Sequence, residues 1–559
     1  MRRKLARPKP FAPSPRVYAA FAIAAIIGVA VFLIWWLTSD SRLRRNADAA
    51  REEAASSPAS PPALSKEAII EAALPRGGSL TGSTDVMPLA VERLTGAPLV
   101  RVNRSTDQAE PWLAESWIAS DDHLIYTVKL RPGLASADGT SLTSAGVVSA
   151  LGTIAAMGQP VSVRALDPLT VELRFAAPFA PALRLLDRHP IPGFGPFVED
   201  PAASKRSGVR AFRRNPQYWR KAADGSALPY LDAIDVSTAP APLAQHDFAD
   251  SPISAEDFEA LKKAEQAGKV RLFELGPGLD ADALWFSVSE DVSRRSGQAT
   301  GAANADRPWL TSETVRLAIS AAVDRREYCK QVFYGACDPM AGPVSPANVA
   351  WFNPDFPLGQ ANPQLARAML EELGLRDRNS DGILDDAALR PLRFTLLIRR
   401  DVPSAARAAK FLEGTLKAIG VLMDVTPLSA DALAARRQKG TYDAIYDRIE
   451  VRETDPAMNL DFWLSSGAAH VWNPARSGPP SDWERQLDQL MMKNAASFDR
   501  VERLQAFVDA QKLYLQHMPA IFFGTPHVRI TTGVRVLNPT PSPLRPHLLW
   551  NAEALAVLK

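Results

Sequence analysis

The sequence predicts an α/β body that follows a single N-terminal transmembrane helix. Two observations carry this prediction: β-type and helical stretches alternate along the chain, and one run of 21 residues, 17–37, is apolar and uncharged. The β-type runs are residues 126–130, 170–175 and 392–398, and the helical stretches are residues 314–330, 363–373, 405–419 and 482–517.

Composition and charge narrow the class of protein. The chain has 559 residues, of which 46% are hydrophobic and 23% charged, which is ordinary for a globular protein. The formal net charge is +2, but residues 1–16 hold six basic residues and no acid, so the remaining chain carries −4. A body with this charge has no broad basic surface, and we therefore expect no nucleic-acid partner.

The apolar run has the length of a membrane-spanning helix. At about 1.5 Å per residue, 21 residues extend about 31 Å, which matches the ~30 Å hydrocarbon core of a bilayer. The basic residues before it favour a cytoplasmic tail (1–16), and Trp35 and Trp36 suit the outer interface. We expect an uncleaved anchor in the inner membrane with the body in the periplasm; a cleaved signal peptide and a cytosolic protein are the alternatives.

Residues 38–66 are rich in Ala, Ser, Pro and charge, and this composition predicts a flexible linker. Its 29 residues give a reach of about 30 Å, so the body, residues 67–559, could meet a partner in the bilayer.

Local signals define individual elements. Val315, Ala318, Ile319 and Ala322 recur at helical spacing. Asn362-Pro363 predicts a helix start and Gly374 a helix stop. The two cysteines, Cys329 and Cys337, form either a disulfide, which an exported protein permits, or a pair of small buried hydrophobes; a zinc site is not expected.

Signals of chemistry are sparse. The chain has no nucleophile elbow, zinc-protease, Walker or dinucleotide-binding motif, and its seven histidines are scattered, so neither catalysis nor a cofactor is expected. Asp377, Asn379, Asp381, Gly382 and Asp385 have the spacing of a calcium loop. Position 12 of that loop is Ala388 instead of Glu, and the alternative is a turn rich in Asp and Asn.

Several short motifs follow one another in a familiar order. They are PLVRV (98–102), LAESW (113–117), YTVKLRPG (126–133), DGTSLT (138–143), VVSAL (147–151), GPF (195–197), RNPQYW (214–219), LPYLD (228–232), VRLAISAAVDR (315–325) and LWNAE (549–553). This succession resembles the family 5 extracellular solute-binding proteins, the dipeptide, oligopeptide and nickel binders of ABC importers, from about residue 70 to the end of the chain.

The resemblance implies a periplasmic binding protein-like body of type II, cluster C, with three lobes. Lobe I would comprise about residues 67–98, 190–270 and 520–559, lobe II about 99–189 and lobe III about 271–519. A ligand would lie between lobes I and III, which close about a hinge, and the closed form would be recognised by an ABC permease.

The resemblance also indicates the ligand-binding residues. In peptide-binding members a carboxylate four residues before a Pro pairs with the peptide's amino terminus, and the equivalent residue here is Arg452, next to Glu453. A guanidinium would favour an anionic group of the ligand; alternatively, Arg452 pairs with Glu453 or Asp455, or points to solvent. The further candidates are Asp85, Val86, Trp472 and Asn473, with Trp285 and Trp351 as possible wall residues.

We therefore expect the membrane-anchored, non-enzymatic substrate-binding component of an ABC importer, with a peptide-like or other small-molecule ligand. A receptor or interaction module that kept the fold without transport is the alternative, and an exported hydrolase is disfavoured by the missing motifs.

Overall fold

The computed structural model describes residues 74–207, 209–238, 246–288, 308–473 and 478–558. The predicted tail, anchor and linker lie outside these residues. Among the described helices, none is both long and apolar enough to cross a membrane. Residues Ala73–Lys559 form one compact unit in which strands and helices are interleaved, which confirms the predicted α/β body.

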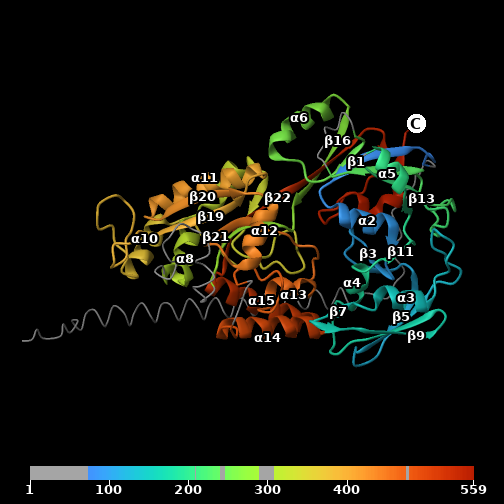
Figure 1. Ribbon diagram of the computed structural model, residues 1–559, viewed down its shortest axis with the longest axis horizontal. Helices are drawn as coiled ribbons and strands as arrows, with labels where there is room; N and C mark the ends of the chain where they lie inside the picture. Colours follow the sequence, from blue (N-terminus) through green and yellow to red (C-terminus); the bar gives the residue numbers. More distant parts are fainter. Residues whose placement is uncertain (1–73, 208, 239–245, 289–307, 474–477, 559) are drawn as a thin grey trace, which may run out of the picture. The chain divides into compact units, whose positions relative to one another are not determined.

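A large mixed sheet runs through this unit (Figure 1). In the described residues it has twelve strands, ten of them in the order β12-β13-β14-β1-β15-β22-β17-β21-β19-β20, while β16 and β18 also pair with β22. Their bounds are β1 Ser79–Thr84, β12 Phe197–Glu199, β13 Arg210–Arg214, β14 Ala233–Ser237, β15 Phe248–Asp250, β16 Val270–Pro277, β17 Ala281–Phe286, β18 Cys337–Pro339, β19 Arg393–Arg399, β20 Leu422–Leu428, β21 Ala444–Ile449 and β22 Ala520–Gly533.

The long strand β22 joins the two halves of the sheet. Its first residues pair with β17, as in Trp285 opposite Ala520, and its last residues pair with β15 and β16. At Gly524 a Cβ atom would lie 2.4 Å from the Cys337 sulfur, so only glycine fits this position. Cys329, on α9 (Arg325–Phe333), forms a disulfide with Cys337 on β18, which is the first of the two alternatives left open by the sequence.

A second, four-stranded antiparallel sheet has the order β5-β6-β10-β9. Its strands are β5 Ala114–Ala119, β6 Ile125–Leu130, β9 Ser162–Asp167 and β10 Thr170–Arg174, and α3 (Ser144–Leu151) packs against it. The runs predicted at 126–130, 170–175 and 392–398 are thus confirmed as β6, β10 and β19. The boundaries of the three lobes stay a prediction.

Two predicted helices are each two helices. The stretch 314–330 consists of α8 (Glu313–Ala322) and α9, because the extended Val323 separates them and the Asp324 side chain accepts hydrogen bonds from the first amides of α9. In the same way Asp499 starts α15 (Arg500–His517) after α14 (Asp482–Ala496). The other two predicted helices are confirmed as α10 (Pro363–Glu372), with Asn362 as its N-cap, and α11 (Pro403–Ala418).

The second half of the large sheet separates two hydrophobic clusters. Successive residues of a strand face opposite sides, and on β21 Ala444 and Tyr446 join the cluster that includes α8, α9 and α11, whereas Ile445 joins the cluster that includes α14 and α15. This alternation fixes which way the following residues of β21 point.

Candidate ligand-binding site

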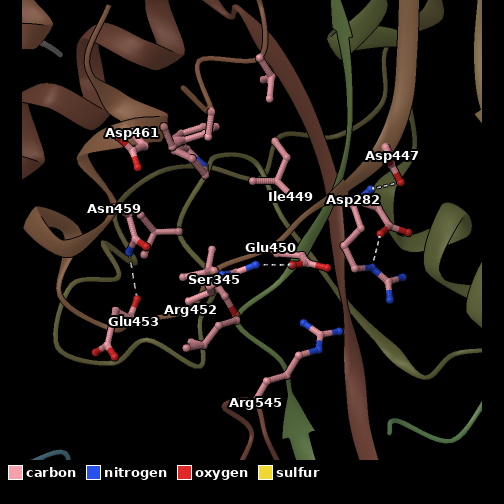
Figure 2. A pocket seen from close by; sticks show the side chains of 18 of the residues that line it. Asp282, Ser345, Asp447, Ile449, Glu450, Arg452, Glu453, Asn459, Asp461 and Arg545 are labelled. Atoms are coloured by element: carbon pink, nitrogen blue, oxygen red, sulfur yellow. Dashed lines mark hydrogen bonds and ion pairs between the residues drawn. The ribbon is translucent and has the colours of Figure 1, made fainter. Parts of the chain in front are cut away.

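A cavity of about 750 Å³ lies at the carboxyl end of β21. The parallel strands β19 and β21 both end there, and in α/β sheets ligands bind outside the carboxyl ends of parallel strands. The wall includes residues 447–454 at the end of β21, the segment around Asp461, and Ser345 and Arg545 from distant parts of the chain (Figure 2). Asn348 and Asp85 also line the cavity.

A buried carboxylate orients one arginine of this wall. Asp282 on β17 lies opposite Arg448 on β21 and accepts a 2.8 Å hydrogen bond from its Nε atom. Asp282 also accepts a hydrogen bond from the Tyr446 hydroxyl (2.8 Å), while the Tyr328 hydroxyl lies 3.3 Å from the same oxygen and forms a 2.5 Å hydrogen bond with Tyr446. Burial lowers the pKa of Arg448, but the adjacent Asp282 outweighs this and raises the pKa above its ordinary value, so the guanidinium stays charged.

The next residue of β21 faces the other way. Asp447 lies opposite Ala283 and accepts the Arg448 backbone amide at 2.9 Å. Burial raises the pKa of the Asp447 carboxyl above its ordinary value. In the described part of the chain this carboxylate forms no ion pair within 4 Å. The end of β21 therefore presents a cation and an anion to the cavity from opposite faces of one strand.

A second group of charges lies next to the end of β21. Arg545 pairs with Asp280 and, through Nε, lies 3.5 Å from the Asp85 carboxylate. Asp280 also accepts the backbone amide of Val451 at 2.9 Å. Burial lowers the pKa of Arg545, and the carboxylates of Asp280 and Asp85 outweigh this and raise it. Asp85, predicted from the sequence, thus lines the cavity from the segment that follows β1.

Arg452 and Glu453 also line the cavity, but their side chains have different partners. Arg452 is 72% exposed, and its ion pair with Glu450 is a loose 3.9 Å (Figure 2). Glu453 is 2% exposed and forms ion pairs with Arg184 (3.3 Å) and Arg104 (3.8 Å). Burial raises the pKa of Glu453, and Arg104 opposes this shift. The alternative that Arg452 pairs with Glu453 or Asp455 is not seen; Asp455 instead binds Arg503.

Three sequence candidates are not among the described wall residues. Trp472 is 0% exposed and packs against Phe462 and Tyr514, with ring centroids 5.6 Å from each. Asn473 follows it in a turn and donates its amide to the His470 carbonyl. Val86 precedes α2 (Met87–Thr95) and donates its amide to Thr84. These three residues have structural contacts in place of a position on the wall.

The two tryptophans considered as wall residues differ. Trp285 lines the cavity with a small part of its surface, while most of it is buried in the cluster that includes α14 and α15. Trp351 lies under the guanidinium groups of Arg500 and Arg503 and is not on the described wall.

The described wall carries six arginines and six carboxylates, so its charges balance. A balanced wall gives no strong long-range attraction to either sign of ligand, and selectivity must come from the placement of individual groups. No histidine or cysteine is among the described wall residues.

The sequence did not point to three of the wall residues, Arg448, Asp282 and Arg545. For Arg448 a usable signal was present, because charged residues that follow the apolar residues of β21 mark the carboxyl end of a strand.

The candidate calcium loop has the contacts of a turn. Asp377 accepts the Gly382 amide at 3.0 Å, and the side chains of Asn379 and Asp381 bond to each other. Within the described residues no group of three or more His, Cys, Asp or Glu side chains is arranged to hold a metal ion.

The fold and the cavity at the end of parallel strands are those expected of a solute-binding protein. Residues 108–470 match the profile described as "Bacterial extracellular solute-binding proteins, family 5 Middle". The chain belongs to this family, which consists of transport solute-binding proteins and not of enzymes.

Individual relatives are distant but extend over most of the chain. A probable ABC transporter-binding protein of Deinococcus radiodurans is 22% identical over 514 residues, covering 79% of this chain and 84% of the relative. A periplasmic alpha-galactoside-binding protein of Rhizobium meliloti is 23% identical over 490 residues, covering 75% and 69%.

The solved structures share the fold. The oligopeptide-binding protein AppA of Bacillus subtilis, in complex with a nonapeptide, superposes with a TM-score of 0.69 at 20% identity and covers 87% of this chain and 100% of AppA. The body therefore has the periplasmic binding protein fold of cluster C, as the resemblance implied.

Proposed function

We propose that this chain is the membrane-anchored substrate-binding component of an ABC importer. Its body would capture a peptide-like or other small solute in the cavity at the end of β21 and deliver it to an ABC permease. The observation that carries the proposal is the cavity of about 750 Å³, which falls within the 300–1,000 Å³ typical of small-molecule sites. The relatives named above, an ABC transporter-binding protein and an oligopeptide-binding protein, support the same function.

Closure of predicted lobes I and III about a hinge would link ligand binding to recognition by the permease. Asp85 and Arg545 belong to the predicted lobe I, and residues 448–452 belong to the predicted lobe III. A ligand that touches both groups binds the closed arrangement more tightly than an open one, so it shifts the population towards closure. The permease would then recognise the closed form.

Among the sequence candidates, Arg452 and Asp85 are proposed to contact the ligand. Both side chains are exposed to solvent, at 72% and 39%, and both line the cavity. Glu453 is proposed to support the site, because its carboxylate is already occupied by Arg104 and Arg184.

Binding is tested with the full-length chain in detergent micelles by thermal unfolding. The ligands are pooled mixed-sequence peptides of two to five residues and an alpha-galactoside, raffinose. A ligand that binds only the folded form stabilises by RT ln(1 + [L]/Kd), so 100 Kd adds about 2.7 kcal/mol and raises the Tm. An unchanged Tm with every ligand would sink the transport proposal and favour the receptor or interaction module.

Anchoring is tested separately by alkaline extraction of membranes from cells that express the full chain. We expect the chain to stay in the membrane pellet and to keep its own N-terminus. The matched variant Ile26→Arg/Val29→Arg places two charges in the apolar run, each costing about 3 kcal/mol in a bilayer, and should be extracted. A wild-type chain that is soluble and begins after residue 37 would mean a cleaved signal peptide instead.

A further inference from the structure

Arg448 presents the free edge of a guanidinium to the cavity. Its Nε atom binds Asp282, and its guanidinium carbon lies 5.9 Å from the centre of the Phe333 ring. The side chain is 31% exposed and lines the cavity. In the described part of the chain its two Nη atoms have no hydrogen-bond partner. The Nε side of the guanidinium is thus held by Asp282, and the two Nη groups are free to donate to a ligand.

The group that fixes this guanidinium is itself held in place. Asp282 is almost fully buried, and the oxygen that Arg448 Nε does not use accepts a hydrogen bond from the Tyr446 hydroxyl, which is itself hydrogen-bonded to the Tyr328 hydroxyl at 2.5 Å. The register of β17 and β21 places Asp282 directly opposite Arg448 on one face of the sheet. The position and plane of the guanidinium are therefore already ordered, and ligand binding loses little conformational entropy at this side chain.

Arg452 offers no comparable arrangement. Its side chain is far more exposed, and its one ion pair, with Glu450, is loose. Ordering a long exposed side chain costs conformational entropy of the order of 1 kcal/mol, which reduces what a contact with the ligand can contribute. Of the two arginines at the end of β21, Arg448 is the one prepared to bind a planar anion.

The nearby carboxylates do not cancel this site. Asp280 is occupied by Arg545 and by the Val451 amide. Asp282 accepts a hydrogen bond from the Tyr446 hydroxyl in addition to Arg448, and Asp447 points to the other face of β21. Glu450, which follows β21 on the wall, forms the loose 3.9 Å ion pair with Arg452. Within β21 itself, a bound anion would meet the Nη donors without an unpaired carboxylate on the same face.

We propose that Arg448 is the residue that selects the solute, by binding a carboxylate of the ligand through its two Nη atoms. The solute is then an acid, such as a peptide with a free C-terminus, and not a neutral sugar. This inference rests on the proposed function, since it names the ligand class of the same cavity. Tyr446 acts as a positioning residue, because it holds the carboxylate that orients Arg448.

The test compares pooled peptides as free acids and as C-terminal amides, with raffinose as the neutral ligand, by calorimetry on the full-length chain. We expect the acids to bind at least tenfold more tightly than the amides, since charge-assisted bidentate hydrogen bonds are the strong ones. Arg448→Lys keeps the positive charge but loses the two parallel Nη donors. This variant should lower the affinity for the free acids about tenfold and leave the affinity for the amides unchanged. The control Arg393→Gln removes another arginine–aspartate ion pair of the large sheet, one that is not on the described wall. It should change neither the affinity for the acids nor the affinity for the amides.

Each result is decisive. Equal affinity for acids and amides, or tight binding of raffinose alone, overturns the carboxylate proposal while the transport proposal stands. Failure of every ligand to bind wild type overturns both. If Arg448→Lys does not fold, Tyr446→Phe serves instead: it should narrow the difference between acids and amides, whereas a purely structural role would lower the Tm and leave that difference intact.

Discussion

Glu453 and Arg184 form a 3.3 Å ion pair between two segments that are 269 residues apart in the sequence. Arg184 lies on α4 (Ala182–Asp187), beyond the last strand of the four-stranded sheet, while Glu453 follows β21 of the large sheet. Arg104 lies between Glu453 and the fully buried Asp187, at 3.8 and 3.6 Å. This buried network fixes the segment that carries Arg452 at the cavity.

Removing the Glu453 charge should strongly destabilise the body. Glu453→Gln leaves the buried Arg104 with one carboxylate in place of two, and breaking a buried ion pair from one side typically costs about 3 kcal/mol or more. Urea unfolding of the full chain measures the loss. The control is Glu450→Gln, whose 51% exposed carboxylate should change stability by no more than about 0.5 kcal/mol. Equal effects of the two variants would contradict a structural role for the network.

Asp250 should make the stability of the body depend on pH. Burial raises the pKa of this carboxyl to about 7, although Thr84 and the amides of Leu548 and Leu549 donate to it. Between about pH 4, where an unfolded Asp titrates, and about pH 7 the folded state holds a proton that the unfolded state has lost. The free energy of unfolding therefore falls as the pH rises through this window, by at most about 1.4 kcal/mol per pH unit.

The variant Asp250→Asn isolates this effect. It has no carboxyl to titrate at this position, so the difference between its unfolding free energy and that of wild type should change between pH 4 and 7 and stay constant above about pH 8. Urea unfolding at a series of pH values measures the difference. A constant difference across the whole range would mean that Asp250 titrates normally.

The sequence allowed most of the secondary structure to be predicted, and its errors have identifiable causes. The helical pattern continues across Val323 and across residues 497–499, so two pairs of helices were each taken as one. Both breaks carry a recognisable signal, an Asp N-cap followed three residues later by Glu: Asp324 with Glu327, and Asp499 with Glu502. These capping signals would have placed the breaks.

The site could be predicted only in part, because its key contacts join distant residues. Arg448 and Asp282 are 166 residues apart, and only the register of β17 and β21 brings them together. Asp85 and Arg452, which line the cavity, were predicted because the family resemblance points to their positions. Trp472 shows the opposite case: a large aromatic residue gives the same sequence signal in a core as in a wall, and here it lies in the core.

Loss of the Cys329–Cys337 disulfide should destabilise the body moderately. The bridge closes a loop with a sequence separation of eight residues, and the loop-entropy relation gives about 2.6 kcal/mol for a loop of this size. The variant Cys329→Ala/Cys337→Ala should lose about this amount in urea unfolding. Reducing agent should destabilise wild type similarly and leave the variant unchanged, and a wild type indifferent to reduction would contradict the prediction.

Reversing the charge at Arg452 should weaken an acidic ligand without harming the fold. Arg452 is exposed and only loosely paired, so Arg452→Asp should change the unfolding free energy by about 0.5 kcal/mol or less. If the side chain contacts the ligand, the added carboxylate should repel an acidic peptide and lower its affinity about tenfold, and Arg452→Gln should lower it less. Calorimetric titration of both variants measures this. Because the two Nη atoms of Arg448 are proposed to bind the ligand carboxylate, we expect Arg452→Gln to lower the affinity less than Arg448→Lys does. The reverse order would mean that Arg452, and not Arg448, binds the carboxylate.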